Sequence, residues 1–393
     1  MHLTPLRGKK MMLKYLRNFG LFILSFIVLS SQVFAAADRE VRLNELEQQM
    51  KQVATETAMG TYGANTAIAR PEVDGKGWFA SADVLYWKGR VGGTEYAFSD
   101  QDMFATLPIK GRKKYIRLDW GWGLRAGLGY HFDHDGWDFL AEYTWWEDDG
   151  SSSLGAGLNG SVVALKGSSS ITQPDGPFVY CRSAKSQYDL DYQALDANLG
   201  RNYYVSSTVS FRPFWGLKAA RIDLDQNTRY TGGGRTNIGT SSDPAFILGV
   251  ENNTVSVRES CKFLGLGPRT GIGSAWYMGN DLSIFGSATG ALLLGNFHVR
   301  HKENYSALEA SHIELKASSL AFSPTVNFEL GMRYDTYLHE GRHHLGIGVG
   351  VEVNYWWRQN QMLKVDNLST LKFERYSEDI AFYGLTITGR WDF

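Results

Sequence analysis

The sequence is poor in the features that define several large classes of protein. Its 393 residues include only two Cys, and neither belongs to a CxxC pair, so a disulfide framework is excluded and no metal site is expected. The 40 Lys and Arg nearly balance the 41 Asp and Glu, which leaves no basic surplus for a nucleic-acid partner. Only one apolar run approaches the roughly 20 residues that a membrane helix needs. A bundle of membrane helices is therefore excluded.

That one apolar run lies in the N-terminal region. It extends from Phe19 to Ala37, follows a basic stretch and ends in small residues, which is typical of a secretory signal peptide. Cleavage after Ala35 and cleavage after Ala37 fit equally well, and an uncleaved N-terminal anchor is the alternative. Residues 1–37 therefore predict export through the inner membrane.

A short helix is predicted for residues 38–59, which contain neither Gly nor Pro. Leu43, Leu46, Met50 and Val53 recur with the spacing of a coiled-coil seam, but a seam of about two heptads is too short to hold alone. It would need a homo-trimer or homo-dimer, and a solvated tether is the alternative. Residues 60–76 have the Gly, Ala, Asn and Pro content of a linker.

From Gly77 to Phe393 the pattern changes to a period of two. Between Trp120 and Phe132, every second residue is Trp, Leu, Ala, Tyr or Phe, and the residues between them are Gly, Arg or His. Such alternation fits a soluble sandwich or a membrane barrel. Because Trp and Tyr gather at the strand ends, as in the aromatic girdles of outer-membrane barrels, we predict an all-β transmembrane antiparallel up-and-down β-barrel over residues 77–393.

Short and long connections alternate along this barrel region. The short ones are residues 134–136, 200–205, 279–281 and 339–342, and the long ones are residues 89–111, 147–185, 222–254, 299–312 and 357–376. Outer-membrane barrels have short periplasmic turns, long extracellular loops and an even strand number. The runs between the connections predict about ten strands, with twelve as the alternative. Near Ala194 the apolar phase slips by one residue, which predicts a β-bulge there.

The C-terminal strand carries an expected assembly signal. Tyr383, Trp391 and Phe393 share one face of the last predicted strand, and a last strand ending in Phe is what the barrel-assembly machinery recognises. That machinery, the outer-membrane lipid and lipopolysaccharide are the expected partners, and the cell outer membrane is the expected location.

A family resemblance is carried by four motifs. They are GWFASADVLYWKG (Gly77 to Gly89), WGLRAGLGYHFDHDGWDFLAEYTWW (Trp122 to Trp146), SFRPFWGLKAARID (Ser210 to Asp223) and the closing FYGLTITGRWDF. The chain resembles the Legionella-type, MOMP-like family of pore-forming outer-membrane proteins over essentially all of residues 77–393. The resemblance implies an abundant barrel that lets small solutes through the outer membrane. The family's chlamydial members that cross-link their envelope are richer in Cys, so that role is not expected.

No pattern in the sequence predicts catalysis. GxSxG and HExxH motifs do not occur, and no spacing brings a nucleophile to a base, so we expect no enzyme, no catalytic residue and no cofactor. His343 and His344 follow His339 in a predicted short turn, and we interpret them as solvated residues rather than metal ligands. His131 and His134, at another turn, are interpreted in the same way.

Charged residues occupy the inward phase of the predicted strands. They are Arg125, Glu142, Arg212, Lys218, Arg269, Glu329, Arg333 and Glu352. If they line a water-filled lumen, this set predicts a mild anion preference. We expect a porin-like pore for small solutes or ions, which the Gly-rich inward phase and the family resemblance favour. The alternative is a non-conducting barrel that serves as a structural anchor or adhesin through its long loops, since about ten strands leave a narrow lumen.

Both Cys residues are predicted near the extracellular rim. Export places Cys181 and Cys261 in an oxidising space where thiols tend to pair. Their strands are not predicted neighbours, so an intramolecular disulfide would require loop 147–185 to fold across the mouth. Free thiols and an intermolecular bridge are the alternatives.

Overall fold

The computed structural model describes residues 77–101, 110–132, 136–166, 177–206, 208–232, 234–237, 254–279, 281–305, 312–338, 343–367 and 372–393. The predicted signal peptide, helix and linker lie outside these ranges and stay predictions. Within them, no helix is long and apolar enough to cross a membrane.

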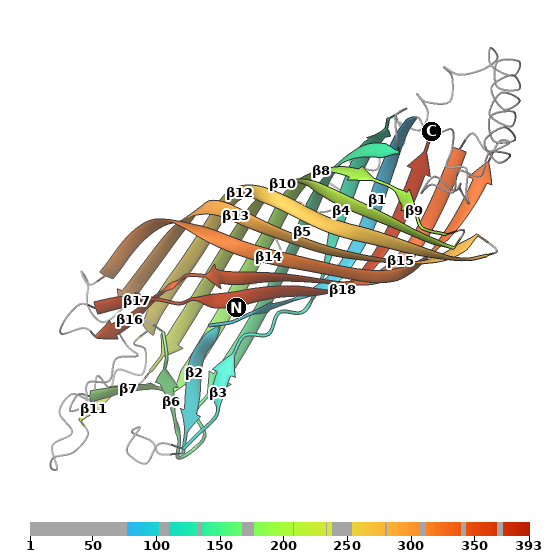
Figure 1. Cartoon of the computed structure of the whole chain (residues 1–393). Coiled ribbons are helices and arrows are strands. Elements are labelled where there is room, and N and C mark those ends of the chain that lie inside the picture. Colours follow the sequence, from blue (N-terminus) through green and yellow to red (C-terminus); the bar gives the residue numbers. More distant parts are fainter. Residues whose placement is uncertain are drawn as a thin grey trace, which may run out of the picture. The chain divides into compact units, whose positions relative to one another are not determined.

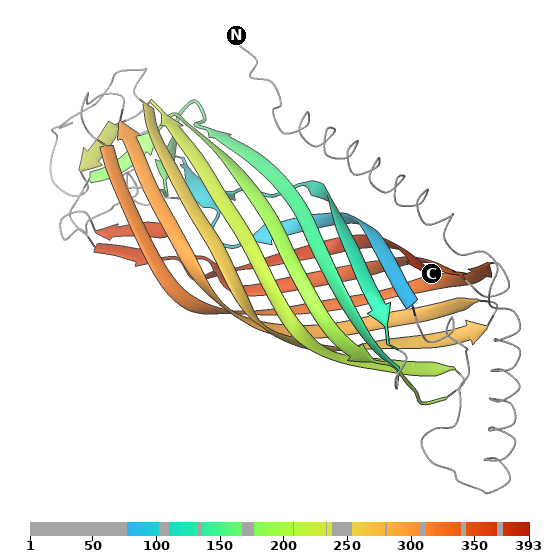
Figure 2. The ribbon, with the colours of Figure 1, turned by 90° about the horizontal axis from the view of Figure 1, so that it is seen from above.

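Ten of the described strands form one closed antiparallel barrel, as predicted (Figures 1 and 2). In order around the barrel they are β1 (Gly77–Val91), β4 (Trp120–His131), β5 (Trp137–Gly155), β8 (Ser183–Arg201), β10 (Val209–Thr231), β12 (Thr254–Gly279), β13 (Leu282–Tyr305), β14 (His312–Leu338), β15 (His343–Asn360) and β18 (Glu378–Asp392). β18 then pairs with β1 and closes the ring. Nε1 of Trp87 in β1 donates to Oγ1 of Thr386 in β18 at 3.1 Å across this closing seam.

The connections divide between the two ends as the sequence predicts. Short turns join β4 to β5 and β12 to β13, where Gly136 and Gly279 adopt φ values of 69° and 87°, in the left-handed region that favours Gly. The two-residue strand β9 (Tyr203–Tyr204) lies at this end. Short turns are periplasmic in outer-membrane barrels, so this is the periplasmic end.

The long connections carry further strands at the opposite, extracellular end (Figure 1). β2 (Glu95–Asp100), β3 (Lys113–Tyr115), β6 (Ser161–Ala164), β7 (Pro177–Cys181) and β11 (Gly234–Asn237) form a five-stranded sheet. β16 (Leu363–Asn367) and β17 (Lys372–Arg375) form a hairpin. Three separate loops thus contribute to one extracellular sheet.

The side chains of β8 show how the barrel changes along its length. Toward the periplasmic end Leu195 faces outward and is 51% exposed, while Asp196 faces inward and is buried. Toward the extracellular end the arrangement is inverted, because Asp191 faces outward and Tyr192 is buried inside. An apolar outer face suits lipid, and an apolar interior suits a wall surrounded by water. We call these two parts the membrane half and the extracellular half.

This inversion corrects the bulge predicted at Ala194. The pairing of β8 with β5 and with β10 runs through Ala194 without a register shift, and the side chains keep alternating. The apolar residues change face because the strand leaves the membrane there. An unbroken strand that crosses the membrane boundary gives the same sequence signal as a slip in register.

Candidate functional site

Two cavities lie inside the membrane half of the barrel. The periplasmic cavity has a volume of about 240 Å³ and is lined by residues of the periplasmic barrel end, among them Gly77 and Phe393. The central cavity has a volume of about 140 Å³. Arg212 and Ser287 line both cavities, so the two are adjacent.

All eight charged residues singled out in the sequence line these cavities. Seven border the central cavity, and Arg333 borders the periplasmic cavity. The structure brings them together with three carboxylates that the sequence reasoning missed: Asp83, Asp138 and Asp196. Each occupies an inward position of its strand. The alternation of inward and outward residues along β1, β5 and β8 is the sequence signal that identifies all three.

Ion pairs form a charged layer across the middle of the lumen. Arg125 lies 3.1 Å from Asp83 and 2.7 Å from Glu352. Glu352 also accepts hydrogen bonds from Asn327, Asn354 and Thr386. Together with Arg125, four side chains thus donate to this carboxylate.

A second group of ions in the same layer is centred on Asp196. Nζ of Lys218 lies 3.0 Å from the Asp196 carboxylate, and Arg269 lies 3.5 Å from it. Counting Asp83 and Asp196 with Glu142, Glu329 and Glu352, five carboxylates face four cations in the central layer, which are Arg125, Arg212, Lys218 and Arg269. The mild anion preference inferred from the eight candidates alone therefore has no basis in this layer.

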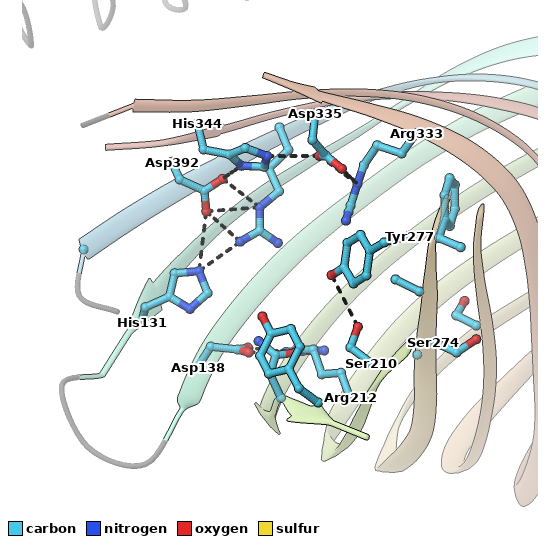
Figure 3. Close-up of a pocket in the computed structure, with 18 of the residues that line it drawn as sticks. His131, Asp138, Ser210, Arg212, Ser274, Tyr277, Arg333, Asp335, His344 and Asp392 are labelled. Atoms are coloured by element: carbon cyan, nitrogen blue, oxygen red, sulfur yellow. Dashed lines mark hydrogen bonds and ion pairs between the residues drawn. The ribbon is translucent and has the colours of Figure 1, made fainter. Parts of the chain in front are cut away.

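The histidines assigned to turns meet in a network at the periplasmic end (Figure 3). His344 lies inside the barrel, with Nδ1 2.6 Å from Asp392 and Nε2 3.0 Å from Asp335. Nε2 of His131 lies 2.9 Å from a guanidinium nitrogen of Arg390, which also pairs with Asp392 at 2.6 Å. The interpretation of His344 and His131 as solvated turn residues is therefore wrong. Both are inward residues of strands, at the positions next to the turns. His134 and His339 lie outside the described residues.

Aromatic side chains fill the lumen directly above the charged layer. We call Trp87, Trp146, Tyr192, Phe263, Trp356 and Phe382 the aromatic plug, and each is at most 2% exposed. The ring of Tyr192 in β8 lies 4.9 Å from Phe382 in β18 and 5.9 Å from Trp356 in β15. Since β8 pairs with β5 and β10 instead, these contacts cross the lumen. The cations of the charged layer abut the plug, with Lys218 5.7 Å from the Trp356 ring centre.

Buried ion pairs hold the extracellular mouth. Lys166, which follows β6, is 1% exposed and places Nζ 2.9 Å from Glu259 of β12. His301 of β13 lies between Glu259 and Glu303, at 3.3 and 2.6 Å. Burial alone would lower the pKa of Lys166, but the Glu259 carboxylate raises it above its usual range. We call Lys166, Glu259, His301 and Glu303 the mouth cluster.

Of the alternatives that the sequence leaves open for Cys181 and Cys261, the structure has the free thiols and not the intramolecular disulfide. Both thiols are free and buried; Cys181 donates to the carbonyl of Val162 and Cys261 to that of Gln359. Strand register separates them. Their positions can be compared along β10. Cys181 comes two residues before Ser183, which pairs with Thr231 of β10. Cys261 pairs with Leu224 of β10, which is seven residues from Thr231. At about 3.3 Å per residue this is roughly 23 Å, far beyond the reach of a disulfide.

The C-terminal residues complete the periplasmic rim. Phe393 lines the periplasmic cavity and exchanges two backbone hydrogen bonds with Trp78. Its ring lies 4.9 Å from Trp391, and Tyr383 is exposed on the outer face. Their role as an assembly signal stays a prediction.

Comparisons with solved structures find matches of low sequence identity and low TM-score. The outer membrane protease OmpT from Escherichia coli is 11% identical, with a TM-score of 0.38, over 84% of this chain and 100% of that one. A Pseudomonas aeruginosa FadL homologue is 8% identical, with a TM-score of 0.24, over 81% and 90%. The P. putida toluene transporter TodX is 9% identical, with a TM-score of 0.22, over the same shares. At these scores we transfer neither activity nor substrate.

The sequence comparisons agree with the barrel. No curated protein matches the chain at a significant level. The model of one family, described as the Legionella pneumophila major outer membrane protein precursor, matches residues 71–393, which include the whole barrel. The family and the barrel support an outer-membrane location. The chain belongs to this family of major outer membrane proteins.

Proposed function

We propose that the protein is an outer-membrane anchor barrel that presents its extracellular sheet and is closed to diffusion in the conformation described here. One observation carries the proposal: the aromatic plug joins side chains from opposite walls and leaves each at most 2% exposed. A solute would have to displace several packed aromatic rings. Removing one buried Phe or Trp ring costs roughly 3–5 kcal/mol of folding free energy. The proposal includes no catalytic role.

The mouth cluster supports the same proposal. Lys166 ties the loop after β6 to Glu259 in the barrel wall, and the backbone carbonyl of Gly93 accepts a hydrogen bond from Nζ at 3.0 Å. Two loops and the wall are thereby joined at a site from which water is excluded. Such an arrangement fixes the extracellular sheet on the barrel, as presentation of a surface requires.

A gated pore for small solutes or ions is the second candidate. The observation that favours it is the membrane half itself, in which charged side chains border cavities of about 240 and 140 Å³. Buried charges cost free energy unless each is paired, and an anchor alone does not need them. In this candidate function the plug is the gate, and the charged layer selects ions once it opens.

Planar-bilayer recording of the full mature chain tests the proposal. We expect no long-lived conductance steps from the wild-type protein, and steps from a Trp356→Ala/Phe382→Ala variant, because the double truncation removes the rings that Tyr192 contacts across the lumen. Leu330→Ala, on the exposed outer face, is the matched control and should stay silent. Regular long-lived steps from the wild type would overturn the anchor in favour of the pore. Brief openings of the wild type that become permanent in the double variant would support gating by the plug.

A further inference from the structure

The periplasmic cavity exposes cationic side chains to its interior, whereas the carboxylates that pair with them are buried. The side chains of Arg212, Arg333 and Arg390 are 24%, 26% and 28% exposed. The side chains of their partners Asp138, Asp335 and Asp392 are 2%, 2% and 9% exposed. All six residues line the cavity. A molecule inside it therefore meets guanidinium groups, whereas the carboxylates are shielded.

The hydrogen bonds of His344 add a fourth cation. Its two ring nitrogens both face carboxylates, at 2.6 Å from Asp392 and 3.0 Å from Asp335. A neutral imidazole can donate from only one nitrogen, so both contacts are satisfied only by the imidazolium. Nε2 of His131 lies 2.9 Å from the Arg390 guanidinium and 3.4 Å from the Asp392 carboxylate, and we do not count His131 among the cations. Four cations thus stand against three carboxylates.

The guanidinium groups approach the cavity from different walls. Arg212 comes from β10, and Arg333 comes from β14, which are separated in the barrel by β12 and β13. Figure 3 shows Arg333 directed toward Tyr277 and Ser210, and Arg212 next to Asp138. Hydroxyl groups and guanidinium forks are the groups that bind carboxylate and phosphate oxygens.

We propose that the periplasmic cavity is a binding site for a small oxyanion, either a dicarboxylate or a phosphate, that enters from the periplasm. The volume of about 240 Å³ lies below the roughly 300–1,000 Å³ of sites for drug-sized ligands. The ligand must therefore be smaller than a drug-sized molecule. The site lies on the periplasmic side of the plug. The inference is therefore independent of whether the barrel conducts.

Calorimetric titration of the full mature chain in detergent, at low ionic strength, tests the site. The probes are succinate, inorganic phosphate and, as the neutral isostere of succinate, succinamide. We expect saturable binding of one or both anions and none of succinamide. Preference for succinate would identify a dicarboxylate site, and preference for phosphate would identify a phosphate site.

Two paired variants locate the binding. Removal of an Arg alone would leave its Asp as an uncompensated charge and could unfold the barrel. Arg212→Gln/Asp138→Asn instead removes one ion pair with little change in volume. Arg333→Gln/Asp335→Asn removes the Arg333–Asp335 pair and, with it, the charge of the carboxylate that faces His344. We expect each to weaken anion binding by about tenfold or more. Arg221→Gln/Asp223→Asn, which removes an ion pair on the outer face, should bind as the wild type does. Heat-dependent migration on SDS gels confirms that each variant is folded.

The outcomes that overturn the inference are specific. They are absence of saturable anion binding, equal binding of succinamide and succinate, or wild-type binding by both paired cavity variants.

Discussion

Nδ1 of His344, at the start of β15, lies 2.6 Å from Oδ2 of Asp392, at the end of β18. The imidazolium thereby joins two neighbouring strands to Asp335 of a third, at 3.0 Å. Without the His344 imidazolium, the buried carboxylates of Asp335 and Asp392 would be paired only with Arg333 and with Arg390, respectively, among these contacts.

This arrangement predicts the effect of removing the ring. We expect His344→Ala to lower the free energy of unfolding by about 1.5–3 kcal/mol, the range for hydrogen bonds to charged groups. Urea unfolding in detergent measures the change. His298→Ala, on the exposed outer face of β13, serves as control. Equal stability of the two variants would show that His344 does not bridge the carboxylates.

Arg125 holds the central layer together, because it pairs with Asp83 and Glu352 at once. Arg125→Gln should destabilise the barrel by about 3–5 kcal/mol, as expected when a buried ion pair loses one partner. Adding Asp83→Asn and Glu352→Gln to it should restore most of the loss. Thermal unfolding compares the single and triple variants, with Arg258→Gln as the control at an outward position. A triple variant no more stable than the single one would contradict this account.

The mouth cluster predicts a pH dependence in the extracellular half. Burial of His301 opposes its protonation, but the hydrogen bonds to Glu259 and Glu303 outweigh burial and raise its pKa to about 9. Because this pKa lies above that of the unfolded chain, roughly 6.5, the stabilisation is complete below about pH 6.5 and is lost as the pH rises through 9.

Limited proteolysis of the extracellular loops can measure this dependence. We expect cleavage to accelerate between pH 7 and pH 10 in the wild type, after correction for the protease's own pH profile with an unfolded substrate. In His301→Gln the change should be much smaller. Protection that increases with pH in the wild type would contradict the prediction.

The two thiols should be unreactive in the folded protein. Cys181 and Cys261 are buried, and burial raises the pKa of Cys181 to about 12, so almost no thiolate is present at neutral pH. We expect alkylation of both residues only after unfolding, without any reductant. Peptide mapping of unreduced protein that recovers a linked pair would contradict the structure.

The barrel was readable from the sequence because its signal is local. A period of two, girdle aromatics such as Trp120 and Trp122, and the alternation of short and long connections each follow from neighbouring residues. The same reasoning placed Arg125 and Glu352 in the lumen. It failed at Ala194 because a boundary between lipid and water, unlike a bulge, is a property of the surroundings and not of the strand.

The remaining features depend on contacts between distant residues. His344 has its partner 48 residues away in Asp392, and nothing near either residue distinguishes an ion pair from a solvated turn. Tyr192 and Phe382 meet only because the ring of strands closes, so an aromatic residue in the inward phase does not by itself reveal a plug. The positions of Cys181 and Cys261 along the barrel likewise required the register of β10.

The pairing of β1 with β18 is expected to be the last step of barrel folding. The hydrogen bond from Trp87 to Thr386 joins residues 299 positions apart, whereas every other pairing around the ring joins barrel strands that follow one another in the chain. Hairpins can therefore form one after another at small entropic cost, and only the last step must close the longest loop. A chain halted before that step is a curved sheet with two bare edges, which the hydrocarbon interior of a bilayer does not tolerate.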